Sequence, residues 1–394
     1  MPSKIRDRGN GAYEIAAYAG YDEKGRQIVK RKTVKAKSLK EAMKLQAAFE
    51  MSLQQGDLTL TGRLKLSEFA RQWFDDHCRK NLAPKTQRNY RNHLNNRILP
   101  ALGHIDINKL RPQHIIRFIS SLQEQGSRFD GREGRVSEDS VSYSFRVLSS
   151  MLQDAVQWQV IPSNPCQRVA APKVVRKRVR IMDEESIGKM IAALAGEPMK
   201  YRTIIMLAID SGLRLGEMMG LKWPDIDFNR SELSVTKSNQ ALVGKGVFTK
   251  CPKNESSVRS VALSATTMSL LEEYRREQEE IRWQLGDKWV DEGWVFTKWN
   301  GLPMYPDTPS HWFRIFLERH GLPHMRFHAL RHLSATVLIA QGVPLKNVSS
   351  RLGHADIRTT ANIYGEALQS VDRQAADKMD EFLLRNAARR FKTP

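Results

Sequence analysis

The apolar and polar positions at the start of this chain predict a small α+β unit over residues 1–57. The stretches Tyr13–Ala19 and Gln27–Val34 are rich in β-branched and aromatic residues, which is typical of strands, and 22–25 between them predict a turn. Residues 4–8 predict a short third strand. Ser38 and Glu41 form a capping box, which predicts a helix from there to about residue 55.

Residues 63–166 instead carry apolar positions at helical spacing and predict four helices. The first has a continuous apolar face, made by Leu66, Phe69, Ala70, Trp73, Phe74 and His77. Pro84 and Pro112 open the second and third helices, and the apolar repeat from Val141 to Val156 marks the fourth. The glycine-rich stretch 126–135 predicts a loop. A DNA-binding unit is our interpretation of this bundle, and a dimerisation bundle is the alternative.

The third and largest unit, residues 182–370, is predicted to be mainly helical with a small antiparallel sheet. Strands are expected at 232–237, 246–250 and 258–263, with 251–257 as a hairpin turn that presents Lys253. A last segment, 371–394, has apolar residues at helical spacing and predicts a helical tail. The tail either packs on its own unit or docks on a neighbouring copy of the chain.

The charge of the chain points to a polyanionic partner. Its 394 residues contain 63 Lys and Arg against 43 Asp and Glu, a formal net charge of +20. Double-stranded DNA is the leading candidate and a membrane surface is the competing one, but no apolar run is long enough to span a bilayer. The 3 cysteines form no CxxC pair, which favours a reducing, cytoplasmic compartment and argues against a structural zinc.

Basic side chains gather in three places that we predict to contact DNA. They are Lys30, Arg31, Lys32 and Lys35 in the second strand, Lys85, Arg88 and Arg91 in the second helix of the bundle, and Arg176, Lys177 and Arg178 in a basic linker at 167–181. The strand residues also fit a solvated edge that prevents aggregation, and the linker also fits a nuclear localisation signal.

Candidate chemistry lies between Met325 and Tyr364. His328 and Arg331 share the first turn of a predicted helix, where free N–H groups favour a phosphate. His332 is expected to pack behind them, and His354 follows a helix-ending Leu-Gly. Far upstream, Arg214 stands in Ser-Gly-Leu-Arg-Leu-Gly-Glu217. The spacing of His328 and His332 also fits zinc, although no third ligand pattern accompanies them.

Together these residues resemble the tyrosine recombinase (integrase) family. The resemblance is carried by the order of the residues Arg214, Lys253, His328, Arg331, His354 and Tyr364 and by the strings Ser-Gly-Leu-Arg-Leu-Gly-Glu, His-x-Leu-Arg-His and Leu-Gly-His. It covers about residues 180–370. The first two units resemble the arm-type DNA-binding domain and the SAM-like core-binding domain of phage and conjugative-transposon integrases.

The resemblance implies a role for each of these residues. Tyr364 would attack the scissile phosphodiester to give a 3′-phosphotyrosyl link, with Arg214 and Arg331 on the non-bridging oxygens. Lys253 would protonate the leaving 5′-oxygen, with Lys250 as the alternative acid. His328 would assist proton transfer and His354 would hydrogen-bond the phosphate. Glu217 would support Arg214. Neither a metal nor a cofactor is required.

The resemblance also implies an assembly. A homo-tetramer would bind core and arm-type attachment sites and exchange strands through a Holliday junction, aided by an excisionase and a host DNA-bending protein. The rival hypotheses are a type IB topoisomerase-like enzyme, a non-catalytic DNA-binding regulator and a metal-dependent nuclease.

Overall fold

The chain, seen here as a computed structural model, divides into two compact units, Met1–Arg176 and Lys177–Pro394. The structure describes residues 5–21, 26–54, 64–124, 126, 134–174, 182–242, 244, 246–250, 258–354 and 356–363, together with 376, 379–380 and 382–384. Each unit is described by itself.

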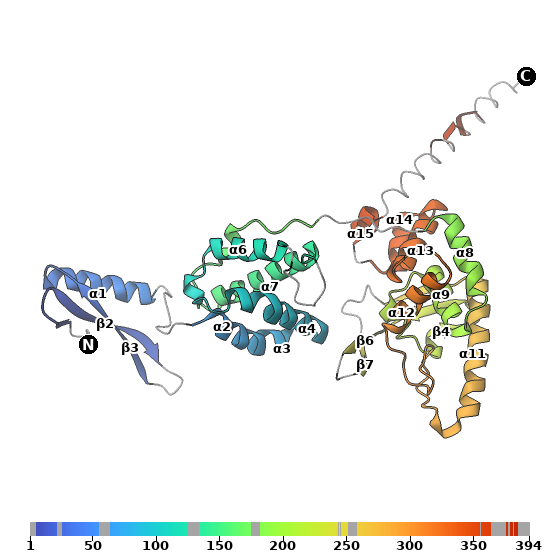
Figure 1. Cartoon of the computed structure of the whole chain (residues 1–394), viewed down its shortest axis with the longest axis horizontal. Coiled ribbons are helices and arrows are strands. Elements are labelled where there is room, and N and C mark those ends of the chain that lie inside the picture. Colours follow the sequence, from blue (N-terminus) through green and yellow to red (C-terminus); the bar gives the residue numbers. More distant parts are fainter. Residues whose placement is uncertain are drawn as a thin grey trace, which may run out of the picture. The chain divides into compact units, whose positions relative to one another are not determined.

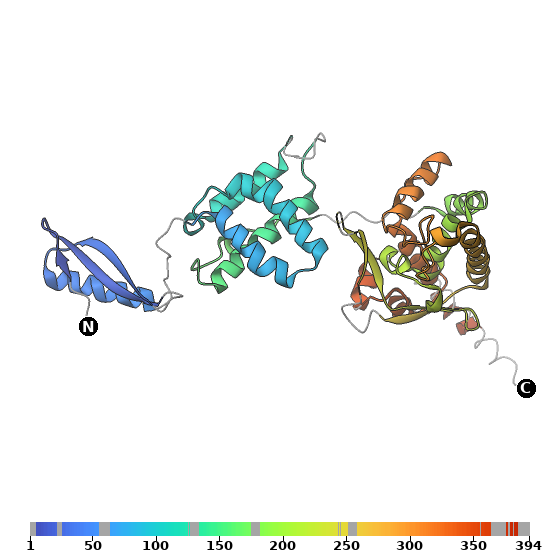
Figure 2. The ribbon, with the colours of Figure 1, turned by 90° about the horizontal axis from the view of Figure 1, so that it is seen from below.

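The N-terminal residues form an antiparallel sheet covered by one helix, as predicted. Strands β1 (Arg6–Asp7), β2 (Ala12–Tyr21) and β3 (Gln27–Lys35) lie in the order β1-β2-β3, and helix α1 (Leu39–Gln54) follows (Figures 1 and 2). The Ser38 hydroxyl accepts a hydrogen bond of 3.3 Å from the Glu41 amide, which caps α1. The Glu41 carboxylate accepts from the Lys37 amide rather than from that of Ser38, so the predicted capping box is half formed.

The register of the sheet divides the basic residues of β3 between two faces. Lys30 and Lys32 lie on one face, and Arg31 and Lys35 lie on the other. The partners of Lys32 and Lys30 are Ile15 and Ala17, which are buried against α1. The open face also carries Tyr18, which is 46% exposed. Arg31 and Lys35 are therefore the residues of this set that extend from the open face.

The second part of the first unit contains the four predicted helices. They are α2–η1–α3 (Leu66–Trp73, Phe74–Cys78, Arg79–Asn81), α4–η2–α5 (Pro84–His93, Leu94–Ile98, Leu99–Leu102), α6 (Pro112–Gln123) and α7 (Glu138–Gln157). The first two helices each pass through a π-helical turn, η1 and η2, which sequence periodicity did not predict. Short 3₁₀ turns occur at Ile107–Lys109 (η3) and Pro165–Arg168 (η4).

The core of this bundle is the apolar face that the sequence predicts. Leu66, Phe69 and Trp73 are buried, and the Trp73 indole donates a hydrogen bond of 2.5 Å to the Asp154 carboxylate of α7. Lys85, Arg88 and Arg91 are exposed on α4. Tyr90 of α4 is partly buried and stacks on Trp73, while these basic side chains remain open to a ligand.

The second unit is mainly helical. Its helices are α8 (Glu184–Leu194), α9 (Met199–Ser211), α10 (Leu215–Met218), α11 (Ala265–Leu285), α12 (Thr308–Arg319), α13 (His328–Ala340), α14 (Leu345–Leu352) and α15 (Ile357–Ile363), with 3₁₀ turns at Trp223–Asp225 (η5) and Gly286–Lys288 (η7). The strands are β4 (Ile226–Asp227), β5 (Glu232–Val235), β6 (Ser238–Leu242), β7 (Gly246–Lys250) and β8 (Arg259–Ala262). The predicted multidomain α+β fold, with small antiparallel sheets, is confirmed.

The predicted hairpin between residues 246–250 and 258–263 is wrong. Strand β7 pairs with β6, and β8 pairs with β5 in a separate sheet of order β4-β5-β8. Strand β6 is not predicted from the sequence, because Ser238 and Asn239 favour turns. Here the buried Asn239 side chain donates to the Met219 carbonyl at 2.7 Å and accepts from the Thr249 hydroxyl at 2.8 Å. These tertiary hydrogen bonds override the local preference.

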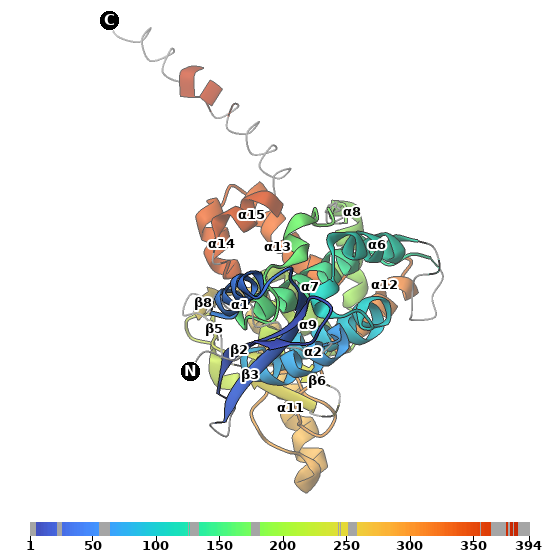
Figure 3. The same cartoon turned by 90° about the vertical axis from the view of Figure 1, so that its left-hand side faces the viewer.

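Packing around α9 positions the ends of several helices near one another. Helix α9 is buried through Ile204, Ile205, Leu207 and Ala208, and it packs against α11 and α13. A smaller apolar cluster, Ala335, Ile339, Val348 and Leu352, joins α13 to α14. Figure 3 shows α13, α14 and α15 beside one another. The C-terminal ends of α9 and α14 are thereby held close to the start of α13.

Candidate active site

Arg214 is positioned by a helix end and by a carboxylate. Helix α9 stops at Gly212, whose φ of 62° is left-handed and favours glycine. Arg214 then precedes α10, so Glu217 lies one turn ahead of it and accepts from the Arg214 backbone amide at 3.0 Å and from its Nη1 at 2.7 Å. Arg214 Nη2 donates to the Gly353 carbonyl at 3.0 Å. The predicted neighbours are in contact, with the Arg214 side chain 41% exposed.

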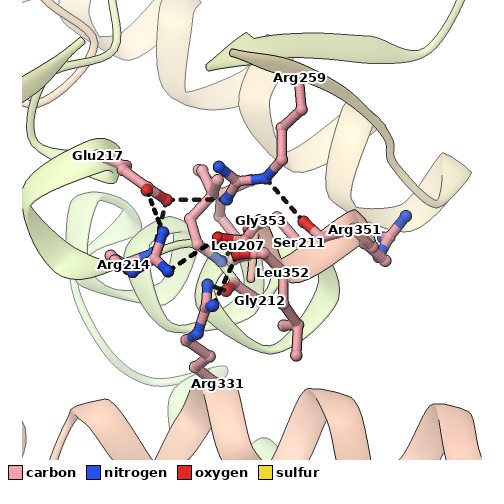
Figure 4. A network of polar contacts seen from close by, with 11 residues as sticks. Leu207, Ser211, Gly212, Arg214, Glu217, Arg259, Arg331, Arg351, Leu352 and Gly353 are labelled. Atoms are coloured by element: carbon pink, nitrogen blue, oxygen red, sulfur yellow. Dashed lines mark hydrogen bonds and ion pairs between the residues drawn. The ribbon is translucent and has the colours of Figure 1, made fainter. Parts of the chain in front are cut away.

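Arg331 is only 3% exposed and is held by backbone. Its Nη1 donates to the Gly212 carbonyl and its Nη2 to the Leu352 carbonyl, each at 2.6 Å (Figure 4). One guanidinium therefore ties the end of α9 to the end of α14. Because both acceptors are carbonyls, its positive charge is not cancelled by these two bonds and still acts on nearby groups.

The predicted histidines lie in this charged environment. His328 begins α13, and its ring lies 5.1 Å from that of His332, which is buried. Burial, together with the charge of Arg331 and Arg214, lowers the pKa of His328. His354 follows Gly353, and its Nδ1 lies 2.8 Å from the Thr360 hydroxyl of α15.

The histidines are consequently neutral near pH 7. Burial is the largest cause that lowers the pKa of His354 to about 4, followed by the charges of Arg331 and Arg214. Burial and then His328 and Arg331 lower the pKa of His332 to about 4. A bound anion would offset the arginine charge and raise these pKa values, so the cluster is suited to a phosphate.

Arg259 is a member of this cluster that the sequence analysis missed. Its side chain is 8% exposed, and its Nη2 donates to Glu217 Oε2 at 2.8 Å. Burial raises the pKa of Glu217, but the hydrogen bonds and charge of Arg259 and then Arg214 outweigh that effect and lower the pKa overall. The signal was the alternation in β8, because Arg259 is on the same face as the buried Val261.

Several predicted residues lie outside the described part of the chain. They are Lys253, Tyr364, Arg176, Lys177 and Arg178. Lys250, the alternative acid, ends β7 opposite Ser238. Residue Ile363, which immediately precedes Tyr364, ends α15. Lys253 belongs to the seven-residue segment 251–257, which follows Lys250 in the sequence and lies between β7 and β8.

Two general properties can be stated for the described residues. Within those ranges, no helix is both long and apolar enough to cross a membrane. Nor does the described part gather three or more His, Cys, Asp or Glu side chains in a way that could hold a metal ion.

Comparison with known proteins identifies the family. Residues 180–370 match the Phage integrase family, and residues 65–123 match the phage integrase N-terminal SAM-like domain. The chain is 28% identical to the ICEBs1 integrase of Bacillus subtilis (strain 168), over 95% of this chain and 98% of that relative. It is also 28% identical to a tyrosine recombinase XerC-like protein of Caldanaerobacter subterraneus subsp. tengcongensis, over 95% of this chain and 97% of that relative.

Solved structures share the fold. The Tn1549 transposon integrase in complex with a circular intermediate DNA superposes with a TM-score of 0.65 and 19% identity, over 79% of this chain and 99% of that chain. A lambda integrase tetramer bound to a Holliday junction gives a TM-score of 0.55 at 18% identity, over 90% and 96%. The chain belongs to the phage integrase family, and its class is that of the tyrosine-type site-specific recombinases.

Proposed function

We propose that this protein is the integrase of a prophage or an integrative conjugative element, and that it integrates and excises DNA by cutting and rejoining strands. The observation that carries the proposal is the convergence of Arg214, Arg259 and Arg331 on the ends of α9 and α14 (Figure 4). Histidines with lowered pKa values accompany them. Guanidinium groups that are fixed before the substrate arrives stabilise the charge of a phosphoryl transition state.

In the proposed reaction the Tyr364 oxygen attacks the scissile phosphorus and the bond to the 5′-oxygen breaks. Lys253 gives a proton to that oxygen, and a free 5′-hydroxyl leaves. The 3′-phosphotyrosyl bond keeps the phosphodiester available, so a 5′-hydroxyl from the partner strand can reverse the step. His328 accepts and returns the tyrosine proton; its lowered pKa favours the neutral ring, which has a free nitrogen to accept that proton. His354 donates to a phosphate oxygen.

DNA would be held by the exposed basic residues of the first unit. Lys85, Arg88 and Arg91 lie on the open face of α4, with the Arg91 guanidinium 4.5 Å from the centre of the Phe74 ring. We assign core-site contacts to this face and arm-site contacts to the β-sheet of residues 1–57, led by Arg31 and Lys35. The domain limits 1–57, 63–166, 167–181, 182–370 and 371–394 are part of the proposal. It places the protein in the cytoplasm, at the nucleoid when bound.

The proposed assembly is a tetramer on two duplexes, with the tail of one copy docked on another. Support comes from the lambda integrase tetramer on a Holliday junction and from the tail itself, where Met379 is 58% and Phe382 is 62% exposed. An excisionase and a host DNA-bending protein complete the proposal. Deletion of residues 372–394 should abolish cooperative assembly on DNA. Unchanged cooperativity would contradict docking between copies.

The test of the reaction uses a nicked attachment site as a suicide substrate, with wild type and Tyr364→Phe, in EDTA. We expect a protease-sensitive, SDS-stable DNA adduct with wild type alone. No adduct on a site that the protein binds would favour a regulator, and cleavage that requires a divalent metal and leaves no adduct would favour a metal-dependent nuclease. Cleavage and relaxation without sequence preference would favour a topoisomerase-like enzyme.

A further inference from the structure

The last turn of α14 contacts three arginines from three different parts of the second unit. The consecutive carbonyls of Arg351, Leu352 and Gly353 accept from Arg259 Nε at 2.8 Å, Arg331 Nη2 at 2.6 Å and Arg214 Nη2 at 3.0 Å (Figure 4). The carbonyls at a helix C-terminus lack intrahelical partners and carry partial negative charge. They therefore form a row of acceptors that fixes the spacing of three guanidinium groups.

Arg259 has a second contact, which reaches Arg214. Glu217 Oε2 accepts from Arg259 Nη2 at 2.8 Å, while Glu217 Oε1 accepts from Arg214 Nη1 at 2.7 Å. The buried carboxylate is thus shared by two guanidinium groups. Without Arg259 it would be left with Arg214 alone and would draw that guanidinium away from a bound phosphate.

The fit of Arg259 against Gly353 is close. A Cβ on Gly353 would lie 2.7 Å from Arg259 Nη1 and 2.9 Å from its Cζ. The guanidinium therefore packs on the peptide that immediately precedes His354. Arg259 is the first residue of β8, the strand that follows the segment containing Lys253. Its contact therefore joins that strand to the peptide that precedes His354.

We infer that Arg259 is a positioning residue for strand cleavage: it orients Arg214 through Glu217 and fixes the α14 end from which His354 extends. The inference rests on the proposed function. Arg259 itself is not assigned a contact with the phosphate. The competing explanation is that Arg259 only stabilises the fold, so the test must separate the rate of cleavage from stability.

The experiment measures single-turnover formation of the covalent adduct, DNA affinity and thermal unfolding for Arg259→Met and Arg259→Lys. Removal of a preorganised donor costs about 10²-fold in rate, and we expect a loss of that order for Arg259→Met. Arg259→Lys should recover little of it, because an ammonium cannot reproduce the guanidinium fork across two acceptors. DNA affinity should stay unchanged. Arg230→Met, at an exposed arginine in the turn between β4 and β5, is the matched control and should cleave as wild type does.

A second substrate carries a neutral methylphosphonate at the scissile position. It lacks the non-bridging charge that Arg214 would neutralise, so a misplaced Arg214 should matter less and the loss from Arg259→Met should shrink. A purely structural defect would give the same loss on both substrates and would overturn the inference. If Arg259→Met does not fold, Arg259→Gln replaces it, with the same two outcomes.

A double-mutant cycle with Glu217→Gln tests the route. If Arg259 acts through Glu217, the double variant should cleave no more slowly than the slower single variant. Additive losses, or a wild-type rate for Arg259→Met, would overturn the inference alone. Absence of any adduct with wild type on a bound site would instead overturn the proposed function, and the inference with it.

Discussion

Basic residues gather in two regions that differ in burial and in the partners of their side chains. On α4, Lys85, Arg88 and Arg91 are exposed to solvent. At the end of α14, Arg331 is 3% exposed and donates two hydrogen bonds of 2.6 Å to backbone carbonyls. The exposed face supplies charge that any basic side chain can provide, whereas the buried cluster supplies fixed geometry. Substitutions that keep the positive charge but change the shape of the side chain should therefore affect the buried cluster and spare the exposed face of α4.

The largest difference is expected when arginine becomes lysine in each region. Arg331→Lys leaves at least one of the Gly212 and Leu352 carbonyls without its donor, which costs about 1–3 kcal/mol of stability. It should lower the rate of adduct formation by about 10³-fold, since lysine cannot reproduce the planar fork. Single-turnover cleavage and urea unfolding measure the two effects.

Arg88→Lys is the matched control for that variant, because it makes the same change on the exposed face of α4. It should leave the cleavage rate and stability close to those of wild type. Equal losses for the two variants would contradict the contrast between fixed geometry and simple charge.

The next effect concerns the peptide on which Arg259 packs. Gly353→Ala forces a residue with a Cβ into the left-handed backbone conformation, which costs about 1–2 kcal/mol of stability. It also places that Cβ 2.7 Å from Arg259 Nη1. Gly342→Ala at φ +80° shares the backbone penalty, but its Cβ would meet nothing within 4 Å. We expect both to lower the unfolding temperature and only Gly353→Ala to slow cleavage, by about tenfold. Equal cleavage rates would contradict the role of this contact.

On the exposed face the expected effects are smaller and depend on salt. Lys85→Ala and Arg88→Ala should each weaken DNA binding several-fold for every sequence, and each should reduce the slope of log K against log salt by about 1. Lys189→Ala is the control, because Lys189 is an exposed residue of α8 paired with Glu185 at 2.7 Å. Affinity titrations at several salt concentrations give the slopes. An unchanged slope would remove α4 from the DNA interface.

The smallest expected effect is the dependence of stability on pH. Burial, followed by nearby positive charge, lowers the pKa of His354 and His332 to about 4 in the folded protein. The unfolded chain keeps the ordinary value near 6.5, so below that pH it binds more protons than the folded chain does. Stability is therefore full above pH 6.5 and falls as the pH drops toward 4.

Thermal unfolding at pH about 7.5 and about 5 checks this direction. The melting temperature should fall by a few degrees at the lower pH. His332→Gln should reduce that fall, while His104→Gln, at an exposed position of the first unit, should not. A protein that is equally stable at both pH values would contradict the buried neutral histidines.

The elements that were predicted well are those that a local sequence pattern determines, without contacts from distant residues. The repeat from Leu66 to Trp73 buries one helix face, and Gly212 ends α9 with a left-handed φ. Strand β6 was missed because Asn239 is satisfied by Met219 and Thr249, which are distant in sequence. The π turns at Phe74–Cys78 and Leu94–Ile98 were missed because the buried residues at their two ends are spaced i, i+4, as in an ordinary α-helix.

The same distinction applies to the site. Arg214 and Glu217 are neighbours on one short helix, so their contact followed from spacing. Arg259 was not predicted, because its partners Glu217 and Arg351 lie 42 and 92 residues away. That Arg331 is buried on backbone carbonyls was also not visible from the sequence, since both acceptors belong to other helix ends.

The most direct test of the proposed reaction identifies the residue that becomes linked to DNA. Adduct trapped on a suicide substrate, in EDTA, is digested with nuclease and protease, and the nucleotide-bearing peptide is sequenced by mass spectrometry. The proposed reaction predicts a single linkage at Tyr364, through a 3′-phosphate. A linkage at another residue, a 5′-phosphate linkage, or no linkage on a bound and cleaved site would contradict it.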